Sequence, residues 1–424
     1  MSSPVLDAFM GYGIEIEYAI VADADLSCLP IADRLLAKAA GGKKSSEVQR
    51  GMLGWSNEFV MHVVEVKNLR PSASLSYLCG LLQNEVRAIN QMLLEWHARL
   101  MPAAMHPWMD PSRETQLWPD DPHGIYRTYA RIFDVKTHGW ANLQSMHVNL
   151  PFANDEQFAR LHAAIRLLLP IIPALAASSP IADGRATGYA DYRMAAYRDN
   201  AAAFPEIAGR IVPETVLNRL EYEETILAPM YRAIAPRDRD RVLQHEWLNS
   251  RGAIARFDRH AIEIRVTDTQ ECPQADLAIA AAIAATAHML YENETAPIAV
   301  QQSFATERLA ALLTACIRDA DLAPIDDAEY LAAFGYPGKH CRARDLWRHL
   351  VRRMGQSELI HAQSWRAQLE IMLEHGPLAR RIEKALGGVH GEIPHERLAA
   401  VYHRLCECLD EGAMFVPAAA AESG

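Results

Sequence analysis

Carboxylates, an imidazole and a guanidinium alternate with apolar residues in four short segments. Such groups can hold divalent cations and can stabilise a phosphoryl group during its transfer. The segments span 11–21, 58–66, 144–152 and 260–269, and the members that we assign to a shared polar face are Glu15, Glu17, Glu65, His147, Glu263 and Arg265.

The chemistry of these side chains favours Mg²⁺, with Mn²⁺ as the alternative ion. The set is rich in oxygen and has one nitrogen, which suits these hard cations better than structural zinc. Clustered carboxylates repel one another, and a bound cation relieves that repulsion. Arg265 follows Glu263 by two residues, so both side chains lie on the same strand face, where the guanidinium would offset the charge of a transferring phosphoryl group.

The alternation also predicts the elements that hold these groups. In residues 11–21 the apolar members are Ile14, Ile16, Tyr18 and Ile20, on the face opposite the two glutamates. Each of the four segments is predicted to be a strand with one apolar and one polar face. If helices cover the apolar faces of one sheet, the polar faces together form a charged trough.

A sheet whose polar face lies in water would show the same alternation, and this reading stays open for any single strand. Glu58 is the exception to the pattern, because it precedes Glu65 by seven residues and so falls on the opposite face of a regular strand. It can join the trough only if a bulge or a loop intervenes near the start of that strand.

Helices are predicted between and after the strands. Ser74 is a plausible N-cap for a long helix with apolar residues at helical spacing as far as Leu100. Beyond about residue 300 the apolar spacing becomes wholly helical. We therefore expect a sheet-containing catalytic unit over residues 1–299, a helical region packed on it over 300–415, and a flexible tail over 416–424.

The composition limits the partners and the compartment. The 424 residues carry 53 acidic and 42 basic side chains, a net charge of −11, which gives no bulk support for binding nucleic acid or an anionic membrane. Seven scattered cysteines suit a reducing compartment, and the N-terminal segment lacks the pattern of a secretory leader. We expect a cytoplasmic protein that acts on small molecules, and a homo-oligomer stays open.

Five segments, in this order, resemble the glutamate–cysteine ligase family, in particular its carboxylate–amine ligase (type 2) branch. The resemblance covers roughly residues 10–290. It is carried by GIEIEYAIV, the pair Glu58 and Glu65, MHVNLPF, PALAASSPIADGRATGYADYR at 173–193 and AIEIRVTDTQECPQADLAIAA at 261–281.

The resemblance implies an α+β fold of the glutamine-synthetase type, with a curved antiparallel sheet, helices on its outer face and a helical C-terminal region. It implies ATP, two or three Mg²⁺ ions, and an amide formed from a carboxylate, such as the glutamate γ-carboxylate, and an amine, such as cysteine, through an acyl phosphate. Arg265 matches the arginine beside the transferred phosphate. The matched metal positions are Glu15, Glu17, Glu58, Glu65, His147 and Glu263.

Other residues are expected near the organic substrates. Arg185 and Arg193 resemble positions close to the acidic substrate, although ordinary surface arginine is the alternative. His138 and Tyr126 are further candidates for substrate contact. His147 is followed by Asn149, whereas the type 2 branch tends to have a second histidine there, so we assign Asn149 to the substrate side.

An acyl phosphate must be shielded from water, which predicts a mobile flap. The candidate segments are Trp118–Arg131 and the loop Gly41–Gly51. Two other functions remain open at this point. One is a phosphotransferase of the same fold, as in guanidino kinases. The other is a degenerate member that binds nucleotide or metal and regulates, and the intact set of acidic residues argues against it.

Overall fold

The computed structural model describes residues 5–355, 362–388 and 391–417. Its centre is one antiparallel sheet in the order β2-β3-β4-β1-β6-β10-β9, with β5 also paired to β1. The strands are β1 (Gly13–Ala22), β2 (Glu47–Arg50), β3 (Leu53–Asn57), β4 (Val63–Asn68), β5 (Ala98–Met101), β6 (Ser145–Pro151), β9 (Ala253–Arg256) and β10 (Ala261–Asp268).

Helices cover the apolar face of this sheet. The apolar members of β1, among them Ile14 and Ile16, are fully buried in a core that they share with three long helices. These helices are α2 (Leu75–Leu93), α6 (Asp155–Leu168) and α12 (Pro273–Tyr291). Ser74 caps α2, because its hydroxyl accepts the backbone N–H of Tyr77. The predicted α+β class, with helices on one face of an antiparallel sheet, is confirmed.

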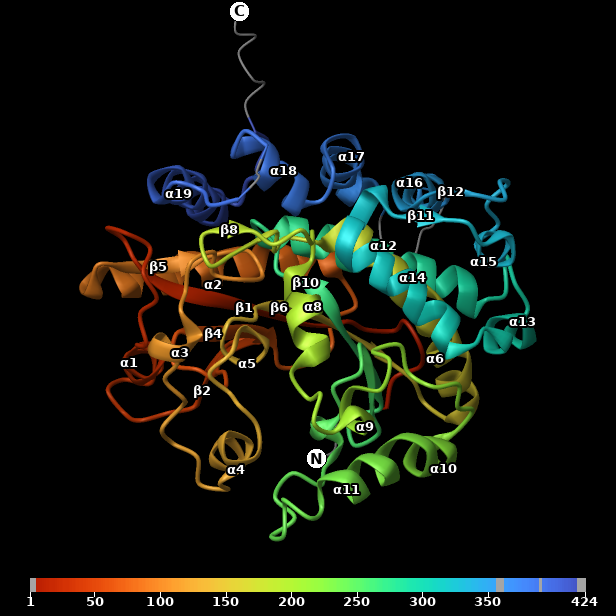
Figure 1. Cartoon of the computed structure of the whole chain (residues 1–424), viewed down its shortest axis with the longest axis horizontal. Helices are drawn as coiled ribbons and strands as arrows, with labels where there is room; N and C mark the ends of the chain where they lie inside the picture. Colours follow the sequence, from red (N-terminus) through yellow and green to blue (C-terminus); the bar gives the residue numbers. More distant parts are fainter. Residues whose placement is uncertain (1–4, 356–361, 389–390, 418–424) are drawn as a thin grey trace, which may run out of the picture.

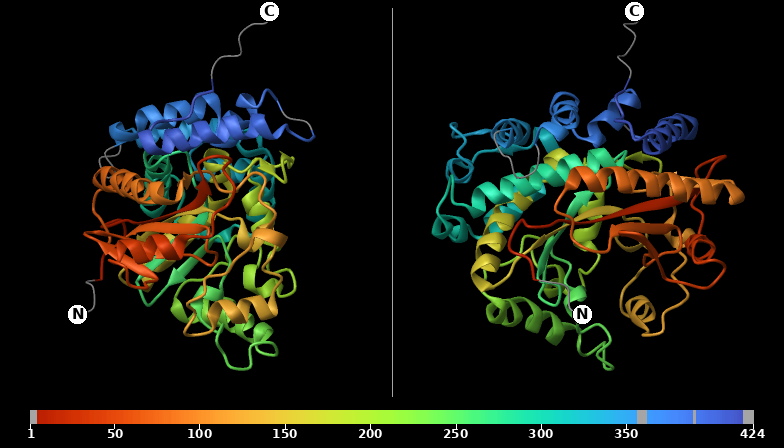
Figure 2. Two further views of the ribbon diagram at one scale, coloured as in Figure 1. Left: turned by 90° about the vertical axis from the view of Figure 1, so that its left-hand side faces the viewer. Right: turned by 180° about the vertical axis from the view of Figure 1, so that it is seen from behind.

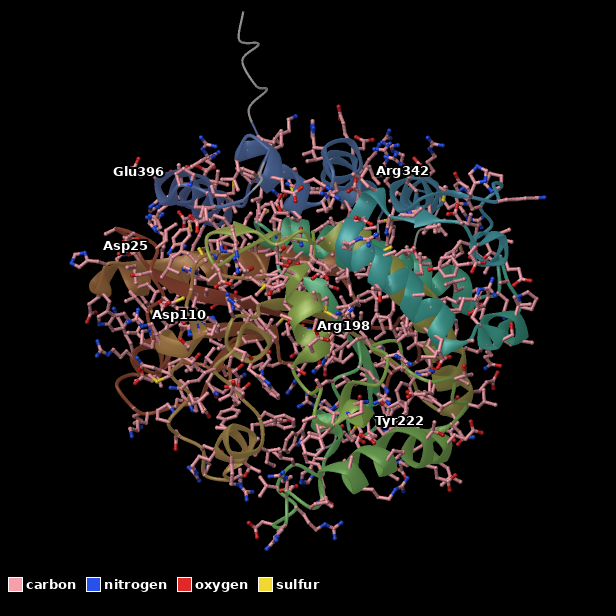
Figure 3. All side chains as sticks on the ribbon, viewed as in Figure 1. Asp25, Asp110, Arg198, Tyr222, Arg342 and Glu396 are labelled. Atoms are coloured by element: carbon pink, nitrogen blue, oxygen red, sulfur yellow. The ribbon has the colours of Figure 1, made fainter. Side chains whose placement is uncertain are left out.

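A second helical layer lies over α2 and α12, at the top of Figure 1. Figure 2 shows it from two further sides as a separate slab beyond the first helices. Charged side chains such as Arg342 and Glu396 point outward from it (Figure 3). Its helices are α16 (Ala343–Met354), α17 (Arg366–His375), α18 (Leu378–Ala385) and α19 (His395–Glu411).

The remaining elements lie around the sheet and around the helices that cover its apolar face. Figure 1 shows α4, α10 and α11 on the side away from the C-terminal layer. The remaining elements are α1 (Ala32–Ala39), α3 (Pro111–Glu114), α4 (Ile125–Ile132), α5 (His138–Ala141), α7 (Pro173–Ala176), α8 (Tyr192–Asp199), α9 (Pro205–Ala208), α10 (Arg219–Tyr222), α11 (Ala228–Ile234), α13 (Ile298–Ser303), α14 (Thr306–Asp319) and α15 (Ala328–Ala333), with the hairpin β7 (Ile181–Ala182) to β8 (Arg185–Ala186) and the paired strands β11 (Pro324–Ile325) and β12 (Cys341–Arg342), which α15 separates in sequence.

Three sequence-based boundaries were wrong. The strand predicted over 58–66 begins only at Val63 and continues to Asn68. The helix predicted as far as Leu100 ends at Leu93, because a 3₁₀ turn and the left-handed residue His97 redirect the chain into β5. Part of the loop predicted over 41–51 is the edge strand β2.

The division into units at 299 and 415 stays a prediction, and residues 418–424 of the predicted tail lie outside the described part. Among the described residues, no helix is both long and apolar enough to cross a membrane.

Candidate active site

A cavity of about 590 Å³ opens on the polar face of the sheet. Its walls hold both signs of charge, because acidic residues of the central strands face basic residues of the same sheet and of α8. The acidic and imidazole members are Glu15, Glu17, Glu47, Glu58, Glu65, His147 and Glu263, and the basic members are Lys67, Arg193, Arg256, Arg259 and Arg265. Aromatic side chains, including Tyr126, Trp140 and Trp247, line another part of the wall.

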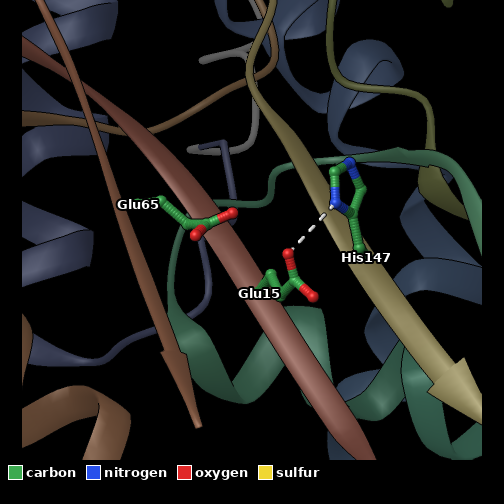
Figure 4. Close-up of side chains that lie close together, drawn as sticks. All are labelled: Glu15, Glu65 and His147. Carbon is green, nitrogen blue, oxygen red and sulfur yellow. Dashed lines mark ion pairs between the residues drawn. The ribbon is translucent and has the colours of Figure 1, made fainter. Parts of the chain in front are cut away.

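The strand register brings the predicted acidic residues together. Glu15 on β1 lies directly across from His147 on β6, and Glu17 lies across from Glu65 on β4. Directly opposed residues have their Cβ atoms about 5 Å apart, so the functional groups of these side chains can meet. Figure 4 shows Glu15, Glu65 and His147 converging from three neighbouring strands.

Glu58 lines the same cavity, although it lies outside the strand β4 that holds Glu65. It follows directly after β3, in the connection that leads to β4. Ser56 of β3 lies opposite Glu65 and donates its hydroxyl to that carboxylate at 2.7 Å. Because Glu58 has the same parity as Ser56, it points to the polar face as an extension of β3. The loop required before β4 is present.

The donor set fits a divalent cation. Glu15, Glu65 and His147 form one group whose ligand atoms lie within 4.8 Å of one another, and Glu17, Glu58 and Glu65 form a second. Among the described residues, the buried Nδ1 of His147 has no hydrogen-bond partner, and it lies 3.7 Å from carboxylate oxygens of both Glu15 and Glu263. Its Nε2 is held by the hydroxyl of Ser145 at 2.8 Å, which leaves Nδ1 as the available ligand.

The protonation behaviour of the cluster reflects crowded carboxylates. Burial, together with the negative charge of Glu15, raises the pKa of Glu65 to about 7. Burial and the charges of Glu17 and Glu65 raise the pKa of Glu58 well above its ordinary value. Burial also opposes ionisation of Glu15, but His147 and Lys67 outweigh it and lower the pKa of Glu15. A cation bound here would relieve the repulsion that raises the first two values.

Glu263 and Arg265 lie on β10, where the chain bulges. Between Ile264 and Thr267 the strand has one residue more than the facing part of β6, and Arg265 lies in that stretch. The Arg265 guanidinium pairs with Glu263, and the Arg256 guanidinium approaches the other carboxylate oxygen of Glu263 at 3.4 Å. Burial opposes the ionised form of Glu263, but the positive charges of Arg265 and His147 outweigh burial and hold the pKa of Glu263 below its usual range.

Three of the predicted substrate residues lie at or beside the cavity. Tyr126 lines it from α4, where its hydroxyl accepts the amide N–H of Asn57 at 3.0 Å. Arg193 lines it from α8 and is only 2% exposed, because it pairs with Asp268 at the end of β10. Asn149 borders the cluster and donates its side-chain amide to Glu15 at 3.0 Å.

Arg185 and His138 are not brought into this cavity. Arg185 lies on β8 with its side chain 63% exposed, near Asp183. His138 contacts the same aspartate at 3.1 Å through Nε2, while its Nδ1 accepts the amide N–H of Asn142. These contacts hold both residues at the β7–β8 hairpin, outside the residues that line the cavity.

Lys67, Arg256 and Arg259 are cavity residues that the sequence interpretation missed. Lys67 follows Glu65 by two residues, so strand parity alone would have placed it on the polar face. Arg256 and Arg259 belong to the short strand β9 and the turn before β10. No pattern of alternation marks that strand, because Ala253, Ile254 and Ala255 are all apolar.

Comparison with known proteins relates this chain to one family of ligases. The profile of the glutamate–cysteine ligase family 2 (GCS2) matches residues 12–382. An uncharacterised protein of Archaeoglobus fulgidus is 37% identical over 273 residues, which cover 64% of this chain and 73% of that protein. A provisionally named glutamate–cysteine ligase 2 of Bradyrhizobium sp. (strain BTAi1) is 26% identical over 339 residues, or 76% of this chain and 73% of the relative.

A solved structure shares the fold. The crystal structure of glutamate–cysteine ligase from Francisella tularensis in complex with AMP aligns with a TM-score of 0.59 at 13% sequence identity. The alignment covers 93% of this chain and 88% of that one.

Proposed function

This chain belongs to glutamate–cysteine ligase family 2, whose profile spans residues 12–382, and from that premise we propose an ATP- and Mg²⁺-dependent ligase that joins a carboxylate to an amine. The carboxylate in the proposed reaction is the γ-carboxylate of glutamate, and the amine is one such as cysteine. The protein acts on these small molecules in the cytoplasm.

One observation carries this proposal. Two groups of converging cation ligands share a single cavity with Lys67 and the arginines that face them. Carboxylates without the basic residues would suit a cation alone, and basic residues without the carboxylates would suit an anion alone. Both together suit a nucleoside triphosphate carried by a divalent cation.

The proposed reaction has two steps. A carboxylate oxygen of the acid attacks the γ-phosphorus of ATP, the bond from that phosphorus to the bridging oxygen breaks, and ADP leaves. The nitrogen of the amine then attacks the acyl carbon, phosphate leaves with the original carboxylate oxygen, and the nitrogen loses a proton. Activation is needed because oxide is a very poor leaving group and phosphate is a good one.

The residues of the chain have separate roles in this proposal. Arg265 offsets the charge on the transferring phosphoryl group, and Glu263 orients its guanidinium. Arg193, Tyr126 and Asn149 are assigned to the organic substrates. The side chains proposed to hold the cations, which would neutralise the phosphate oxygens, are Glu15, Glu17, Glu58, Glu65, His147 and Glu263.

Water must be excluded while the acyl phosphate exists. Ser46 and Glu47 reach the cavity from one proposed flap segment, and Tyr126 reaches it from the other. A closing movement of either segment would cover the reacting carboxylate.

Hydroxylamine trapping tests the function. The protein is incubated with ATP, Mg²⁺, hydroxylamine and a panel of carboxylic acids headed by glutamate, and hydroxamate and ADP are measured. We expect hydroxamate only when a suitable acid and ATP are both present. Formation of a phosphorylated nitrogen compound without hydroxamate would instead identify a phosphotransferase. ADP release at the same rate with and without each acid would contradict the proposed ligase activity.

A further inference from the structure

Lys67 places an ammonium group inside the acidic cluster. Its Nζ lies 2.7 Å from Oε1 of Glu65 and 4.0 Å from Glu47 at the cavity wall. In the pairing of β1 with β4, Lys67 is also the residue directly opposite Glu15. The side chain is 27% exposed, so this positive charge is largely shielded from solvent.

The carboxylate that Lys67 contacts is the one that both candidate cation sites share. Glu65 is a member of the group with Glu15 and His147 and also of the group with Glu17 and Glu58. Its Oε1 receives two donors, the ammonium of Lys67 and the hydroxyl of Ser56, each at 2.7 Å. A divalent ion that binds either group therefore meets the charge of Lys67 at its shared ligand.

We propose that Lys67 is a tethered counter-ion that competes with the divalent cation for Glu65 and thereby weakens cation binding in the absence of nucleotide. The inference rests on the proposed function, since the cation is the one that the ligase reaction uses. A lysine suits this role because its charge is compact and its stem is flexible. When a cation takes Glu65, the ammonium can turn toward Glu47, an exposed carboxylate of the cavity wall.

A purely structural ion pair predicts something different. A pair that served only the fold would change the stability of the protein when it is lost, and its loss would give no reason for a change in cation affinity. Competition predicts that removal of the ammonium tightens cation binding, because a repulsive positive charge is lost. The direction of the change in affinity therefore separates the two roles.

The test is Mn²⁺ binding to the full chain without nucleotide, followed by electron paramagnetic resonance or calorimetry. We expect Lys67→Met to bind Mn²⁺ roughly tenfold more tightly than the wild type, the order of effect for removing a unit charge close to a divalent ion in a hydrated site. Lys67→Arg, which keeps the charge, should stay near the wild-type affinity. Lys38→Met serves as the matched control, because Lys38 pairs with Glu95 outside the cavity.

The outcomes separate this inference from the proposed function. Unchanged or weaker Mn²⁺ binding by Lys67→Met, with normal binding by the wild type, would overturn the competition and leave the ligase intact. No Mn²⁺ binding by the wild type would remove the cation site and overturn both. If Lys67→Met fails to fold, Lys67→Gln has a neutral side chain that can still donate to Glu65 and carries the same expectation.

Discussion

Arg265 shows most clearly how a single residue enters the proposed chemistry. Its guanidinium is held by Glu263, and its backbone N–H donates to the carbonyl of Gly252 at 2.9 Å in the bulged part of β10. Burial works against its charge, yet Glu263 outweighs that effect and raises the pKa of Arg265. The residue is thus a fixed positive charge aimed into the cavity before any substrate arrives.

Replacing this charge should affect turnover far more than folding. We expect Arg265→Ala to lower the rate of ADP and hydroxamate formation by roughly 10²–10³-fold, the usual loss for one preorganised stabilising group. Arg318→Ala, at an exposed arginine of α14, is the control and should keep the wild-type rate. Circular dichroism checks the fold, and a folded Arg265→Ala variant with full activity would remove Arg265 from the mechanism.

Sequence alternation could predict Glu15, Glu17, Glu65, His147 and Glu263 because each lies in a regular part of a strand with a clear apolar face. The position of Glu58 could be predicted only if the end of β3 just before it were known. That strand is hard to recognise, because Leu53 to Ser56 are all buried and so show no alternation of buried and exposed residues. Arg193 could be located only through the family resemblance, because its contact with Asp268 joins positions 75 residues apart.

At the scale of elements, patterning recovers the long pieces and misses the short ones. The strands around β1 and the helices α2, α6 and α12 have enough residues for their periodicity to be read. Strands β2, β5 and β9 have four residues each, too few for a period to emerge. The bulge in β10 depends on pairing with β6, which a single segment does not encode.

A buried ion pair connects the C-terminal helices to the end of the central sheet. Arg381 of α18 and Glu271, which follows β10, are both fully buried and paired. Arg381 also donates to the carbonyl of Phe415 at 2.7 Å, and the backbone N–H of Phe415 donates to Glu271 at 3.2 Å. Three separate segments therefore meet at one pair of charges.

Removing one member of this pair should destabilise the protein strongly. We expect Arg381→Ala to lower the free energy of unfolding by about 3–5 kcal/mol, because Glu271 is left buried without its partner. Arg366→Ala breaks an exposed pair on α17 and should leave the free energy of unfolding nearly unchanged, because solvent screens that pair. Urea unfolding measures the free energy of unfolding of both variants. Equal losses in the two variants would contradict the claim that the buried pair stabilises the protein more than an exposed one.

At the scale of the whole molecule, three buried histidines make the fold sensitive to acid. Burial lowers the pKa of His62 and of His106 to about 4, and burial together with Arg166 lowers the pKa of His162 to about 3. Each is neutral when folded, whereas an unfolded histidine takes up a proton below about pH 6.5. The unfolded state therefore binds more protons, and stability falls as the pH drops below that value.

A substitution of His162 tests this acid sensitivity, because its ring packs against Phe158 and Tyr222 and an aromatic side chain can replace it there. We expect the wild type to lose stability between pH 7.5 and pH 5, and His162→Phe to lose about 2 kcal/mol less over the same interval. Chemical unfolding at the two pH values gives the numbers. The exposed His340→Asn variant should follow the wild type, and a His162→Phe variant with the same acid loss would contradict the assignment.

The acidic excess of the whole chain also has a local meaning. The net charge of −11 includes the carboxylates of the cavity, which face five basic residues of the same cavity wall. A divalent cation and a triphosphate would each find opposite charge there, although the molecule as a whole repels polyanions.

The central claim is that ATP activates a carboxylate on this polar sheet face. The stoichiometry of the trapping reaction tests it most directly, with hydroxamate and ADP measured in the same sample at saturating hydroxylamine. We predict one hydroxamate for each ADP with the preferred acid and neither product without it. ADP produced in full with no hydroxamate from any carboxylic acid would contradict the account.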